Sequence, residues 1–589
     1  MKKNGTIYIG LNDNYHDTSI SILNEKGEIL YSEGLERYLQ YKRGLGCPPD
    51  LDSYIEEIFK KWVNYNGEDV VIVSSWTKNF HRKLKLISFL NLLNFDSSSR
   101  IHKYVQKKGV HPTFHQGLSR QISAMMQSGL GIYNYMKTNY PDSVVRREYQ
   151  KHHLCHITHA IHSSHCNDAL GLVIDGGGDE TSITAFDIQL GQVQKEIVLK
   201  SRFSVGSIYS VITHIIGYSA LKGEEWKVMG LSGYGKFHEE FDKRLRDIFR
   251  YSNGEFSLKS KIIGGHVKKL KKFIITENIP REDIAFTGQK LFEEYLFYVL
   301  DWANKKVPGK NNIIISGGAA LNSLAMGRVA DSGLFERIII PNGPADDGNS
   351  IGAAILSVRK NEGIKKFLNP SESCRSPYTG SEIKESDIKE YVKKSKLPFK
   401  KLTDSSKYAA ELLYANKIIG WIQGRAEFGP RALGNRSILA NPSFSENKDR
   451  LNRVVKFRES YRPFAPSILH EYGKDYFENY SFTPYMEKTL KFLDATVTKV
   501  PAVVHENGTG RLQSVTPEIN KRYYDLISNF NQLSGIPIVI NTSYNVMGKP
   551  IAHSINDVIY VFLNSKIDAV IIGDYCLERP LTFEVDKDE

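Results

Sequence analysis

A short loop rich in arginine and glycine is the part of the sequence whose residue types most clearly suggest chemistry. The segment 424–437 holds Arg425, Arg431 and Arg436 among three glycines, directly after the apolar run 418–422. That run predicts a buried strand, which delivers the loop at its end. Glycine lets the backbone approach an anion closely, and the guanidinium fork of arginine binds phosphate through two parallel hydrogen bonds. The loop therefore predicts a phosphate-binding site rather than a solvated basic turn.

Positive charge continues beyond the loop. Between positions 425 and 462 there are seven arginines and two lysines against four acids. Six further residues of this half are candidates for the same site: Lys456, Arg458, Arg462, Asn541, Ser543 and Asn545. A basic surface with aromatic residues can also bind nucleic acid, so a nucleic-acid partner stays open on these residues alone.

Two histidines at helical spacing could hold a metal ion. His152 and His156 are four positions apart, so on a helix they share one face and can bind the same ion. A third ligand must come from elsewhere in the chain, and Asp346 is the best candidate. Two histidines and one carboxylate with open positions suit Fe(II) or another divalent transition metal. The nearby His153 and His159 are expected only to pack or cap.

Three glycine-rich turns follow apolar strands in the first half of the chain, at residues 10–19, 175–182 and 316–322. A glycine cluster after a strand exposes backbone N–H groups that can bind phosphate. In this order the three turns resemble the two phosphate loops and the adenosine loop of the actin, sugar-kinase and heat-shock-protein superfamily. His16 lies in the first turn beside Asp17. Its imidazole titrates near neutrality, so it is a candidate general base, with a purely structural role as the alternative.

The elements that must position these residues follow from the patterning of the chain. Apolar strand patterns at 7–11, 170–174 and 313–316 alternate with helical patterns such as 51–63, which predicts an α/β architecture. A stretch rich in Asn, Pro, Ser and Gly separates this half from the one that carries the arginine loop. The predicted parts are a first domain at residues 1–366, a linker at 367–382 and a second domain at 383–589.

Length and composition agree with this division. A chain of 589 residues and 66.8 kDa exceeds what one hydrophobic core usually organises. The net charge of +12 is spread widely, for example over the lysine-rich segment 268–272, and indicates attraction for anionic ligands. Five cysteines without a CxxC spacing favour reduced thiols over disulfides or a zinc site. Since the sequence also lacks a membrane-spanning apolar run and a signal-peptide core, a cytoplasmic protein without a membrane partner is expected.

Taken together, these segments resemble the O-carbamoyltransferase family that includes the nodulation-factor, cephamycin and tobramycin enzymes. The matching segments are 15–19, the His152–His156 pair, 227–231, 316–318, 346–348, 424–437, 456–466 and 541–545. The resemblance extends over nearly the whole chain, and the arginine loop is highly specific. It implies an N-terminal TsaD-like domain of the actin-like ATPase superfamily, with a duplicated ribonuclease-H-like fold, followed by a YrdC-like α/β domain.

The resemblance also implies a reaction in two steps. Carbamoyl phosphate and ATP would form carbamoyl adenylate in the YrdC-like domain. The TsaD-like domain would then move the carbamoyl group to a hydroxyl of a small-molecule acceptor, such as a sugar or an antibiotic or other natural product. The implied cofactors are ATP with Mg²⁺ and a divalent metal, Fe(II). A nucleic-acid partner is not implied, and a homodimer stays open.

Roles for the candidate residues follow from the same resemblance. Arg431 and Lys456 would be catalytic in the second domain, and His16 would take the proton of the acceptor hydroxyl in the first. The implied metal ligands are His152, His156 and Asp346. The residues implied to bind the nucleotide or carbamoyl phosphate are Lys227, Gly177, Gly178, Gly317, Gly318, Asn322, Arg425, Arg436, Arg458, Arg462, Asn541, Ser543 and Asn545.

Two other functions compete with this interpretation. Threonylcarbamoylation of tRNA uses the same two domain types as separate proteins, and an isoelectric point near 9.0 would suit it. The fused order of the domains favours the O-carbamoyltransferases instead. An ATP-dependent sensor or chaperone-like binding module of the actin superfamily would need neither the metal ligands nor the arginine loop. Such a module would release ADP and phosphate from ATP, whereas the two-step carbamoyl transfer would release AMP and pyrophosphate.

Overall fold

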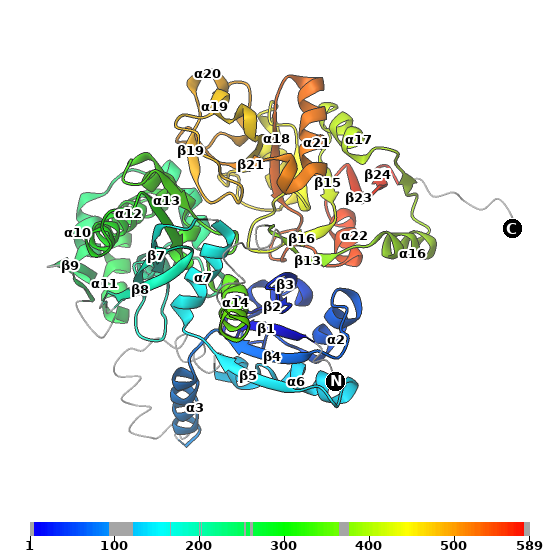
Figure 1. The fold of residues 1–589 in the computed structure, drawn as a ribbon. Coiled ribbons are helices and arrows are strands. Elements are labelled where there is room, and N and C mark those ends of the chain that lie inside the picture. Colours follow the sequence, from blue (N-terminus) through cyan, green and yellow to red (C-terminus); the bar gives the residue numbers. More distant parts are fainter. Residues whose placement is uncertain are drawn as a thin grey trace. The chain divides into compact units, whose positions relative to one another are not determined.

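The computed structural model describes residues 5–93, 122–164, 166–199, 201, 203–252, 255–258, 263–363 and 376–581. The chain divides into two compact units (Figure 1). The first comprises Met1–Leu39 and Arg43–Arg375, and the second comprises Gln40–Lys42 and Ser376–Glu589. Residues 367–375 of the predicted linker, with Cys374, lie outside the described residues. The rest of that segment belongs to the second unit and contains a strand, β13 (Tyr378–Glu382).

The first unit contains two five-stranded sheets with the same topology. The first sheet has the order β3-β2-β1-β4-β5, and the second has the order β8-β7-β6-β11-β12. In each sheet the central strand pairs antiparallel with the hairpin strand on one side and parallel with the strand on the other. The strands of the first sheet are β1 (Thr6–Asn12), β2 (Ser19–Leu23), β3 (Ile29–Gly34), β4 (Asp69–Ser74) and β5 (Val145–Tyr149). Those of the second are β6 (Ala169–Ile174), β7 (Ile183–Gln189), β8 (Gln192–Val198), β11 (Asn312–Ser316) and β12 (Arg337–Ile339). This repeat confirms the duplicated ribonuclease-H-like fold.

Two helices lie between these sheets and carry most of the site described below. Helix α7 (His152–Ser164) packs on β6 and β11, and α14 (Asn349–Glu362) packs on β1 and β2 (Figure 1). The two helices also pack against each other. Gly352 makes this possible, because a Cβ atom there would lie 1.9 Å from the carbonyl oxygen of Cys155.

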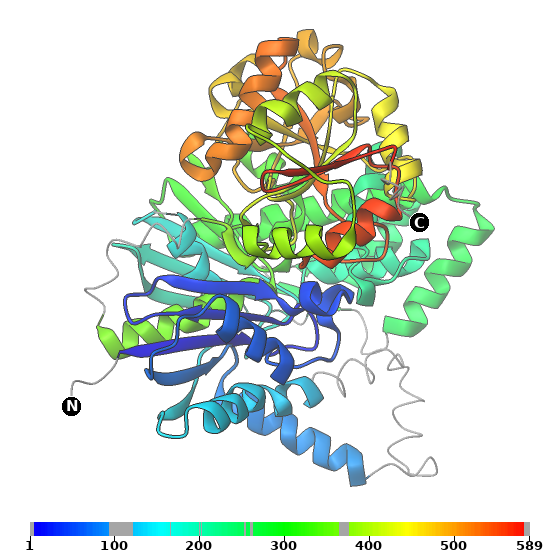
Figure 2. The same ribbon diagram turned by 90° about the vertical axis from the view of Figure 1, so that its right-hand side faces the viewer.

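Helices α2 (Asp52–Lys61) and α6 (Leu130–Asn139) cover the other face of the first sheet (Figure 2). Their buried apolar side chains contact those of β1, β2 and β4. The other helices of this unit are α1 (Leu35–Leu39), α3 (Lys78–Leu93), α8 (Gly206–Ile216), α9 (Glu225–Leu231), α10 (Glu239–Ile248), α11 (Ile263–Thr276), α12 (Arg281–Lys306) and α13 (Ser323–Asp331). A hairpin of β9 (Phe249–Ser252) and β10 (Glu255–Leu258) completes it.

The second unit is built on a mixed eight-stranded sheet with the order β14-β24-β23-β15-β17-β22-β18-β21. Its strands are β14 (Lys400–Lys401), β15 (Ile419–Ile422), β17 (Arg436–Ala440), β18 (Ala465–Leu469), β21 (Gln513–Val515), β22 (Ile538–Ser543), β23 (Ala569–Ile572) and β24 (Tyr575–Glu578). Two small sheets accompany it, β13 with β16 (Arg425–Glu427), and β19 (Thr489–Lys491) with β20 (Thr509–Arg511). The unit is therefore α/β as expected, and its YrdC-like assignment stays a prediction.

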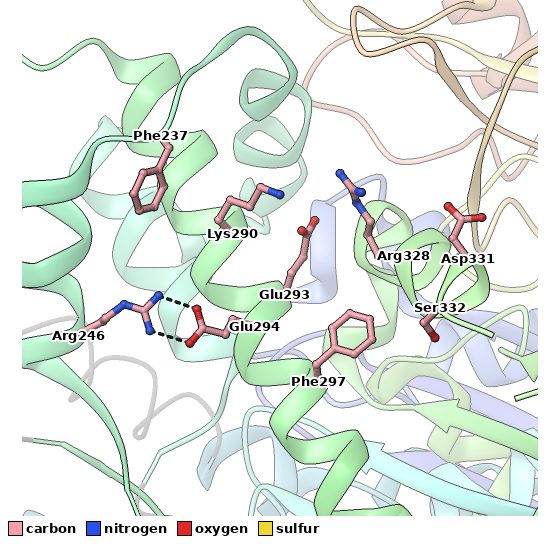
Figure 3. A pocket seen from close by; sticks show the side chains of 9 residues that line it. All are labelled: Phe237, Arg246, Lys290, Glu293, Glu294, Phe297, Arg328, Asp331 and Ser332. Atoms are coloured by element: carbon pink, nitrogen blue, oxygen red, sulfur yellow. Dashed lines mark hydrogen bonds and ion pairs between the residues drawn. The ribbon is translucent and has the colours of Figure 1, made fainter. Parts of the chain in front are cut away.

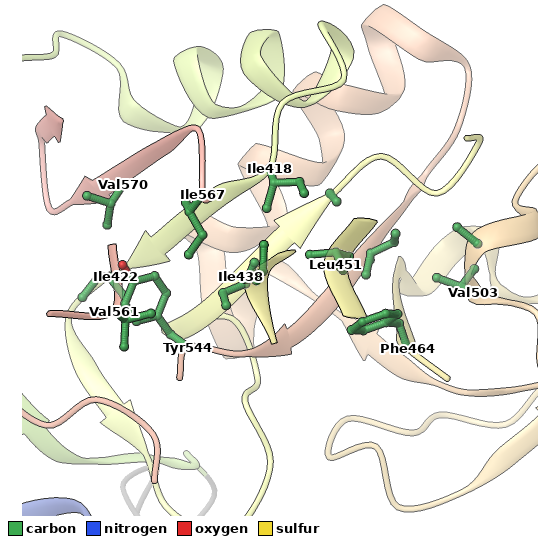
Figure 4. Close-up of a cluster of buried hydrophobic side chains, with 14 of the residues drawn as sticks. Ile418, Ile422, Ile438, Leu451, Phe464, Val503, Tyr544, Val561, Ile567 and Val570 are labelled. Carbon is green, nitrogen blue, oxygen red and sulfur yellow. The ribbon is translucent and has the colours of Figure 1, made fainter. Parts of the chain in front are cut away.

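Apolar side chains cover both faces of the eight-stranded sheet. On one face, Trp421 and Leu439 pack against α17 (Ser405–Tyr414) and α21 (Pro517–Ser534). On the other face, Ile422, Ile438 and Tyr544 pack with α22 (Ile555–Leu563) (Figure 4). Alternation along β15 and β17 places neighbouring residues on opposite faces, as a strand requires. The remaining helices are α16 (Glu385–Ser395), α18 (Glu446–Arg450), α19 (Gly473–Tyr476) and α20 (Asp494–Val497).

Several elements match the patterns that predicted them. The apolar run 418–422 forms the fully buried strand β15, and the pattern 51–63 forms α2. The lysine-rich segment 268–272 lies on α11. Strand β22 runs from Ile538 to Ser543, so the predicted site residues Asn541 and Ser543 lie on a strand. Among the described helices, none combines the length and the apolar character that crossing a membrane requires.

Candidate metal centre and anion site

Four buried side chains converge in the first unit. His152 and His156 lie one turn apart on α7, which begins at His152. Asp175 directly follows β6, and Asp346 begins the short turn Asp346–Gly348 that leads into α14. One potential ligand atom from each of the four lies within 4.8 Å of the others. The neighbouring parallel strands and the α7–α14 contact thus bring together residues that are distant in sequence. We call these four residues the histidine–aspartate cluster.

Asp346 contacts both histidines of the cluster. Its Oδ1 atom lies 3.4 Å from Nε2 of His152 and 3.4 Å from Nε2 of His156. Oδ2 of Asp175 lies 3.7 Å from Nε2 of His152. Burial disfavours charge on Asp346, yet its contacts with His152 and His156 hold the pKa of this carboxyl well below its usual range. Burial also opposes protonation of His152, but Asp175 and Asp346 raise its pKa to about 10.

The donor atoms of this cluster fit a divalent transition metal. Both ring nitrogens of His156 and Oδ1 of Asp346 are buried and accept or donate no hydrogen bond among the described residues. Buried polar atoms without partners are costly, and a shared cation would satisfy those that converge here. Two imidazoles and two carboxylates are a donor set for Fe(II) or a similar ion. The predicted ligands His152, His156 and Asp346 are brought together, and Asp175 joins them as a fourth that the sequence analysis assigned only to a glycine-rich turn.

Neighbouring groups hold the cluster in place. Asn14 donates from Nδ2 to Oδ2 of Asp346 over 2.5 Å. The indole ring of Trp76 stacks on the imidazole of His152, with ring centroids 3.9 Å apart. The main-chain N–H of His152 donates to Oδ2 of Asp179 over 2.8 Å. Such outer contacts fix the orientation of ligating side chains. His153 lies outside the cluster, because its Nδ1 bonds to Thr184 Oγ1 at 2.7 Å.

His16 lies beside the cluster, in the turn after β1. Its Nδ1 atom is 2.9 Å from Oδ2 of Asp17, 3.0 Å from Nη2 of Arg43 and 3.7 Å from Oδ2 of Asp346. These contacts hold the Nδ1 edge of the ring, which leaves Nε2 as the atom for proton transfer. Burial alone would raise the pKa of Asp17, but Arg43 and then His16 hold it well below its usual range. The structure thus brings the predicted base next to the predicted metal ligands.

The glycine-rich turns border the same cluster. Gly318 donates its N–H to Oδ1 of Asp175 over 2.8 Å, and the N–H of Gly177 lies 3.4 Å from Oδ2. Gly178 packs against the His153 ring. Gly317 has φ 91 and lies too close to Ile174 for any side chain. At least two of these N–H groups therefore orient Asp175, a use that the phosphate-loop prediction did not include.

Asn322 and Lys227 make contacts of their own within the first unit. Asn322 caps α13 through Oδ1, which accepts from the N–H of Ala325 over 3.1 Å, and its Nδ2 donates to Gln289 Oε1 over 3.0 Å. Lys227 on α9 pairs with Glu224 at 2.8 Å and lies over the ring of Tyr218. Both side chains are therefore at least partly engaged within the fold.

A hollow with a volume of about 540 Å³ lies near Asn322, along the middle of α12 and beside the C-terminal ends of α10 and α13 (Figure 3). Gln289 links the two regions, because its Nε2 also donates to Glu293 Oε1 over 2.7 Å. The lining residues are Phe237, Arg246, Lys290, Glu293, Glu294, Phe297, Arg328, Asp331 and Ser332. Cations and carboxylates alternate around this hollow, and Arg246 pairs with Glu294 inside it.

In the second unit the arginine loop uses two of its arginines internally. Arg436 is fully buried, and its guanidinium donates to the carbonyl oxygens of Gln423, Asn435, Ser381 and Gly424 at 2.8–3.1 Å. Arg425 donates to the carbonyl oxygens of Thr379 and Gly380 on β13. These contacts show that both residues build the loop. Their role in binding a ligand stays a prediction beside this structural one.

Lys456 contacts two of the predicted polar residues, Ser543 and Asn545. Its buried ammonium donates to the carbonyl oxygens of Ser543 and Asn545 and, over 2.7 Å, to Oδ1 of Asn545. Ser543 Oγ in turn donates to Asn545 Oδ1 over 2.8 Å. Burial, with Arg458 and Arg462 nearby, holds the pKa of Lys456 well below its usual range. Asn541 lies apart from this group and donates to the carbonyl of Ala432 in the arginine loop over 3.2 Å.

Arg511 on β20 adds a cation that the sequence analysis missed. Burial, together with Arg431, Arg458 and Arg462, holds the pKa of Arg511 well below its usual range. Its buried Nε atom has no hydrogen-bond partner among the described residues. Burial also lowers the pKa of Arg431 to about 10. We call Arg431, Lys456, Arg458, Arg462 and Arg511 the cation cluster. Lys456 is buried and the four arginines are half-buried. A dense anion would stabilise such a group of mutually repelling cations.

Other known proteins are similar in sequence to this chain. Residues 7–355 match the family model described as carbamoyltransferase N-terminus, and residues 410–579 match the one described as carbamoyltransferase C-terminus. Nodulation protein U of Sinorhizobium fredii is 34% identical, over 91% of this chain and 93% of that protein. Nodulation protein NolNO of the same species is 32% identical over 74% of this chain, and the match covers 64% of its own length.

More distant likenesses are found among solved structures. The activator of 2-hydroxyisocaproyl-CoA dehydratase from Clostridium difficile, with bound ADPNP, is 15% identical with a TM-score of 0.31, over 62% of this chain and 98% of its own. Full-length HypF, in a phosphate- and nucleotide-bound form, is 12% identical with a TM-score of 0.31, over 62% of this chain and 57% of its own.

Proposed function

The chain belongs to the carbamoyltransferase family, and from that premise we propose that it is an ATP-dependent O-carbamoyltransferase. The observation that carries the proposal is the pair of centres described above. The second unit holds a cluster of five cations suited to two polyanionic substrates. The first unit holds a metal-type donor set with His16 beside it. The cation cluster would activate the anionic substrates. The histidine–aspartate cluster, with His16 beside it, would support acyl transfer.

In the proposed first step, carbamoyl phosphate is converted to carbamoyl adenylate on the cation cluster. Water first releases phosphate from carbamoyl phosphate and gives carbamate, so that the atoms of the step balance. A carbamate oxygen then attacks the α-phosphorus of ATP and expels pyrophosphate, which leaves with the electron pair of the broken P–O bond. Arg431, Lys456 and Arg511 would stabilise the charge that develops on the phosphates, assisted by the Mg²⁺ that accompanies ATP. Each such contact is worth about 2–4 kcal/mol in a preorganised site.

In the proposed second step, an acceptor hydroxyl attacks the carbonyl carbon of carbamoyl adenylate and AMP leaves. His16 would take the hydroxyl proton at Nε2, because Asp17 and Arg43 hold the other edge of its ring. Asp17 would stabilise the imidazolium that forms. A divalent cation, Fe(II) in our proposal, would be held by the histidine–aspartate cluster and would supply Lewis-acid polarisation of an oxygen. The glycine-rich turns around Asp175 and Asn322 are the proposed contacts for the nucleotide.

The proposed acceptor is a small molecule, such as a sugar or an antibiotic or other natural product, handled in the cytoplasm without a nucleic-acid or membrane partner. A homodimer is compatible with this function. Transfer RNA is the alternative acceptor, and the same assay distinguishes it.

The test is product analysis with purified protein, carbamoyl phosphate, ATP and Mg²⁺. We expect AMP, pyrophosphate and phosphate as the products. Adding a panel of alcohols and unmodified tRNA then identifies the acceptor by a mass gain of one carbamoyl group. Transfer to an alcohol supports the proposal, and transfer to tRNA alone would reject the small-molecule acceptor. Formation of ADP without pyrophosphate would reject the chemistry itself.

A further inference from the structure

Glu427 places a buried negative charge inside the arginine loop. It ends β16 and is fully buried. Its Oε1 atom accepts hydrogen bonds from the main-chain N–H groups of Leu433, Asn435 and Arg436 at 2.6, 3.3 and 3.2 Å. These three N–H groups lie at the far end of the loop and point to one oxygen. The carboxylate thus closes the loop on itself.

This contact changes how the loop can bind an anion. Neighbouring main-chain N–H groups that converge on one point form a nest, which ordinarily attracts phosphate. Here the carboxylate of Glu427 already fills that position. A bound phosphate must therefore be held by side chains of the cation cluster and not by these N–H groups. The glycines of the loop allow its main chain to follow this course. At Gly434, for example, a Cβ atom would lie 2.3 Å from the Tyr523 ring.

The carbonyl groups of the loop are held as well. Gln513 Nε2 and the Tyr378 hydroxyl donate to the carbonyl oxygen of Leu433 at 2.8 and 2.9 Å. Asn541 donates to the carbonyl of Ala432, the residue directly after Arg431. The main chain around Arg431 is thus fixed by Glu427 through N–H groups and by amide and hydroxyl donors through carbonyl groups. Arg431 lies between these anchored points, within the closed loop.

We infer that Glu427 is the positioning residue that sets Arg431 in the cation cluster. The inference rests on the proposed function for its catalytic consequence, but its geometric content is independent of the reaction. Removal of the carboxylate releases the N–H groups of Leu433, Asn435 and Arg436 and with them the path of the chain directly after Arg431. A guanidinium displaced by even about 1 Å loses most of its advantage in a preorganised site.

A double-mutant cycle tests this coupling in the full chain. The variants are Glu427→Ala, Arg431→Ala and the double variant, and the readouts are pyrophosphate binding by calorimetry and the rate of AMP formation. Residues that act as one unit have non-additive effects. Each single variant should weaken pyrophosphate binding by about tenfold or more, and the double variant should bind no more weakly than Arg431→Ala. Additive losses, or wild-type binding by Glu427→Ala, would overturn the inference.

Further variants control for misfolding and for a general effect of net charge. Glu427→Gln keeps an acceptor oxygen of the same reach, so it should recover most of the binding lost in Glu427→Ala. If the alanine variant fails to fold, Glu427→Asp, whose shorter side chain draws the acceptor oxygen away from the N–H groups, replaces it in the cycle. Glu446→Gln removes an exposed carboxylate of the same basic region and should bind as wild type. A loss in Glu446→Gln equal to that of Glu427→Ala would show that net charge alone matters and would reject the inference.

The pyrophosphate-binding measurement separates this inference from the proposed function. If the wild-type protein forms no AMP, the proposed function fails, while the coupling of Glu427 to Arg431 is still decided by pyrophosphate binding. If AMP forms normally and the cycle is additive, the inference fails alone.

Discussion

Nε2 of His156 lies 3.4 Å from Oδ1 of Asp346, and neither atom has a hydrogen-bond partner among the described residues. The first residue belongs to α7, and the second begins the turn before α14. Their contact depends on the packing of these two helices between the sheets. The histidine pair is recognisable in the sequence, whereas the carboxylate of Asp346 comes near it only in the fold. The contact between them marks the place where an ion would be held.

Metal content is the first quantity that this contact predicts. The purified protein should bind about one divalent ion per chain, because four ligand atoms converge on one point. His156→Ala should lose the ion. His153→Gln is the matched control, since His153 lies on the same helix but bonds to Thr184. Elemental analysis after reconstitution with Fe(II) measures all three proteins. Equal metal content in the two variants would show that the ligand set is wrong.

Arg511 and Arg436 should separate catalysis from stability. Arg511→Ala removes a cation whose Nε has no internal partner, so AMP formation should fall by about 10²–10³-fold with little change in unfolding free energy. Arg436→Ala leaves four carbonyl groups without their donor and should lower the free energy of unfolding by about 3 kcal/mol or more. Urea unfolding and an AMP assay on both variants check this contrast. A stable Arg436→Ala protein would contradict its structural role.

His16→Asn should uncouple the two half-reactions. Asparagine can still donate to Asp17, so the turn is expected to keep its form. AMP and pyrophosphate formation on the cation cluster should continue, while carbamoyl transfer to the acceptor should slow by about 10²–10⁴-fold. Single-turnover measurement of both steps, with a melting curve as control, tests it. A parallel loss of both steps together with lowered stability would assign His16 a packing role instead.

Asp17 should link stability to pH. Arg43 and His16 hold its pKa below the ordinary value of 3.8 despite burial, so the unfolded chain binds this proton more tightly than the folded one. The stabilisation is therefore complete above the unfolded pKa and is lost as pH falls through the lower folded pKa. Asp17→Asn should lower the unfolding free energy by about 1–2 kcal/mol at pH 7, since the side chain is partly exposed.

The pH series supplies the control for that prediction. Asparagine tolerates the left-handed backbone of position 17, where φ is 54, so the change removes charge without adding strain. The difference from wild type should stay constant between pH 8 and pH 5 and shrink below about pH 4. A difference that grows on acidification would mean that the carboxyl is not stabilised as an anion.

The parts of the fold that the sequence predicted depend on local patterns. The i and i+4 spacing placed His152 and His156 on one helix face, because helical periodicity is a property of neighbouring residues. The apolar run before Arg425 likewise gave β15. Asp175 was missed as a ligand because its approach to His152 depends on how α7 packs against β6, which no local pattern records.

The arginine loop shows that local patterns also fail to assign the role of each residue. Its composition predicts a site for anions, but composition cannot distinguish an arginine that faces a ligand from one that donates to carbonyl groups. Arg436 and Arg425 are of the second kind. Arg511 comes from a separate hairpin and shares no motif with the loop. The predicted backbone contact with phosphate also differs from the structure, since Glu427 takes the N–H groups.

The central claim is that carbamoyl adenylate links the two units, and one isotope measurement tests it most directly. Carbamoyl phosphate labelled with heavy oxygen at its carbonyl group gives carbamate with one labelled and one unlabelled oxygen. Either oxygen can attack ATP, and cleavage at the carbonyl carbon leaves that oxygen on AMP. With a competent acceptor, about half of the AMP should therefore carry one heavy oxygen, because the two carbamate oxygens are equivalent before attack. Mass spectrometry that finds only unlabelled AMP, or ADP in its place, would contradict the account.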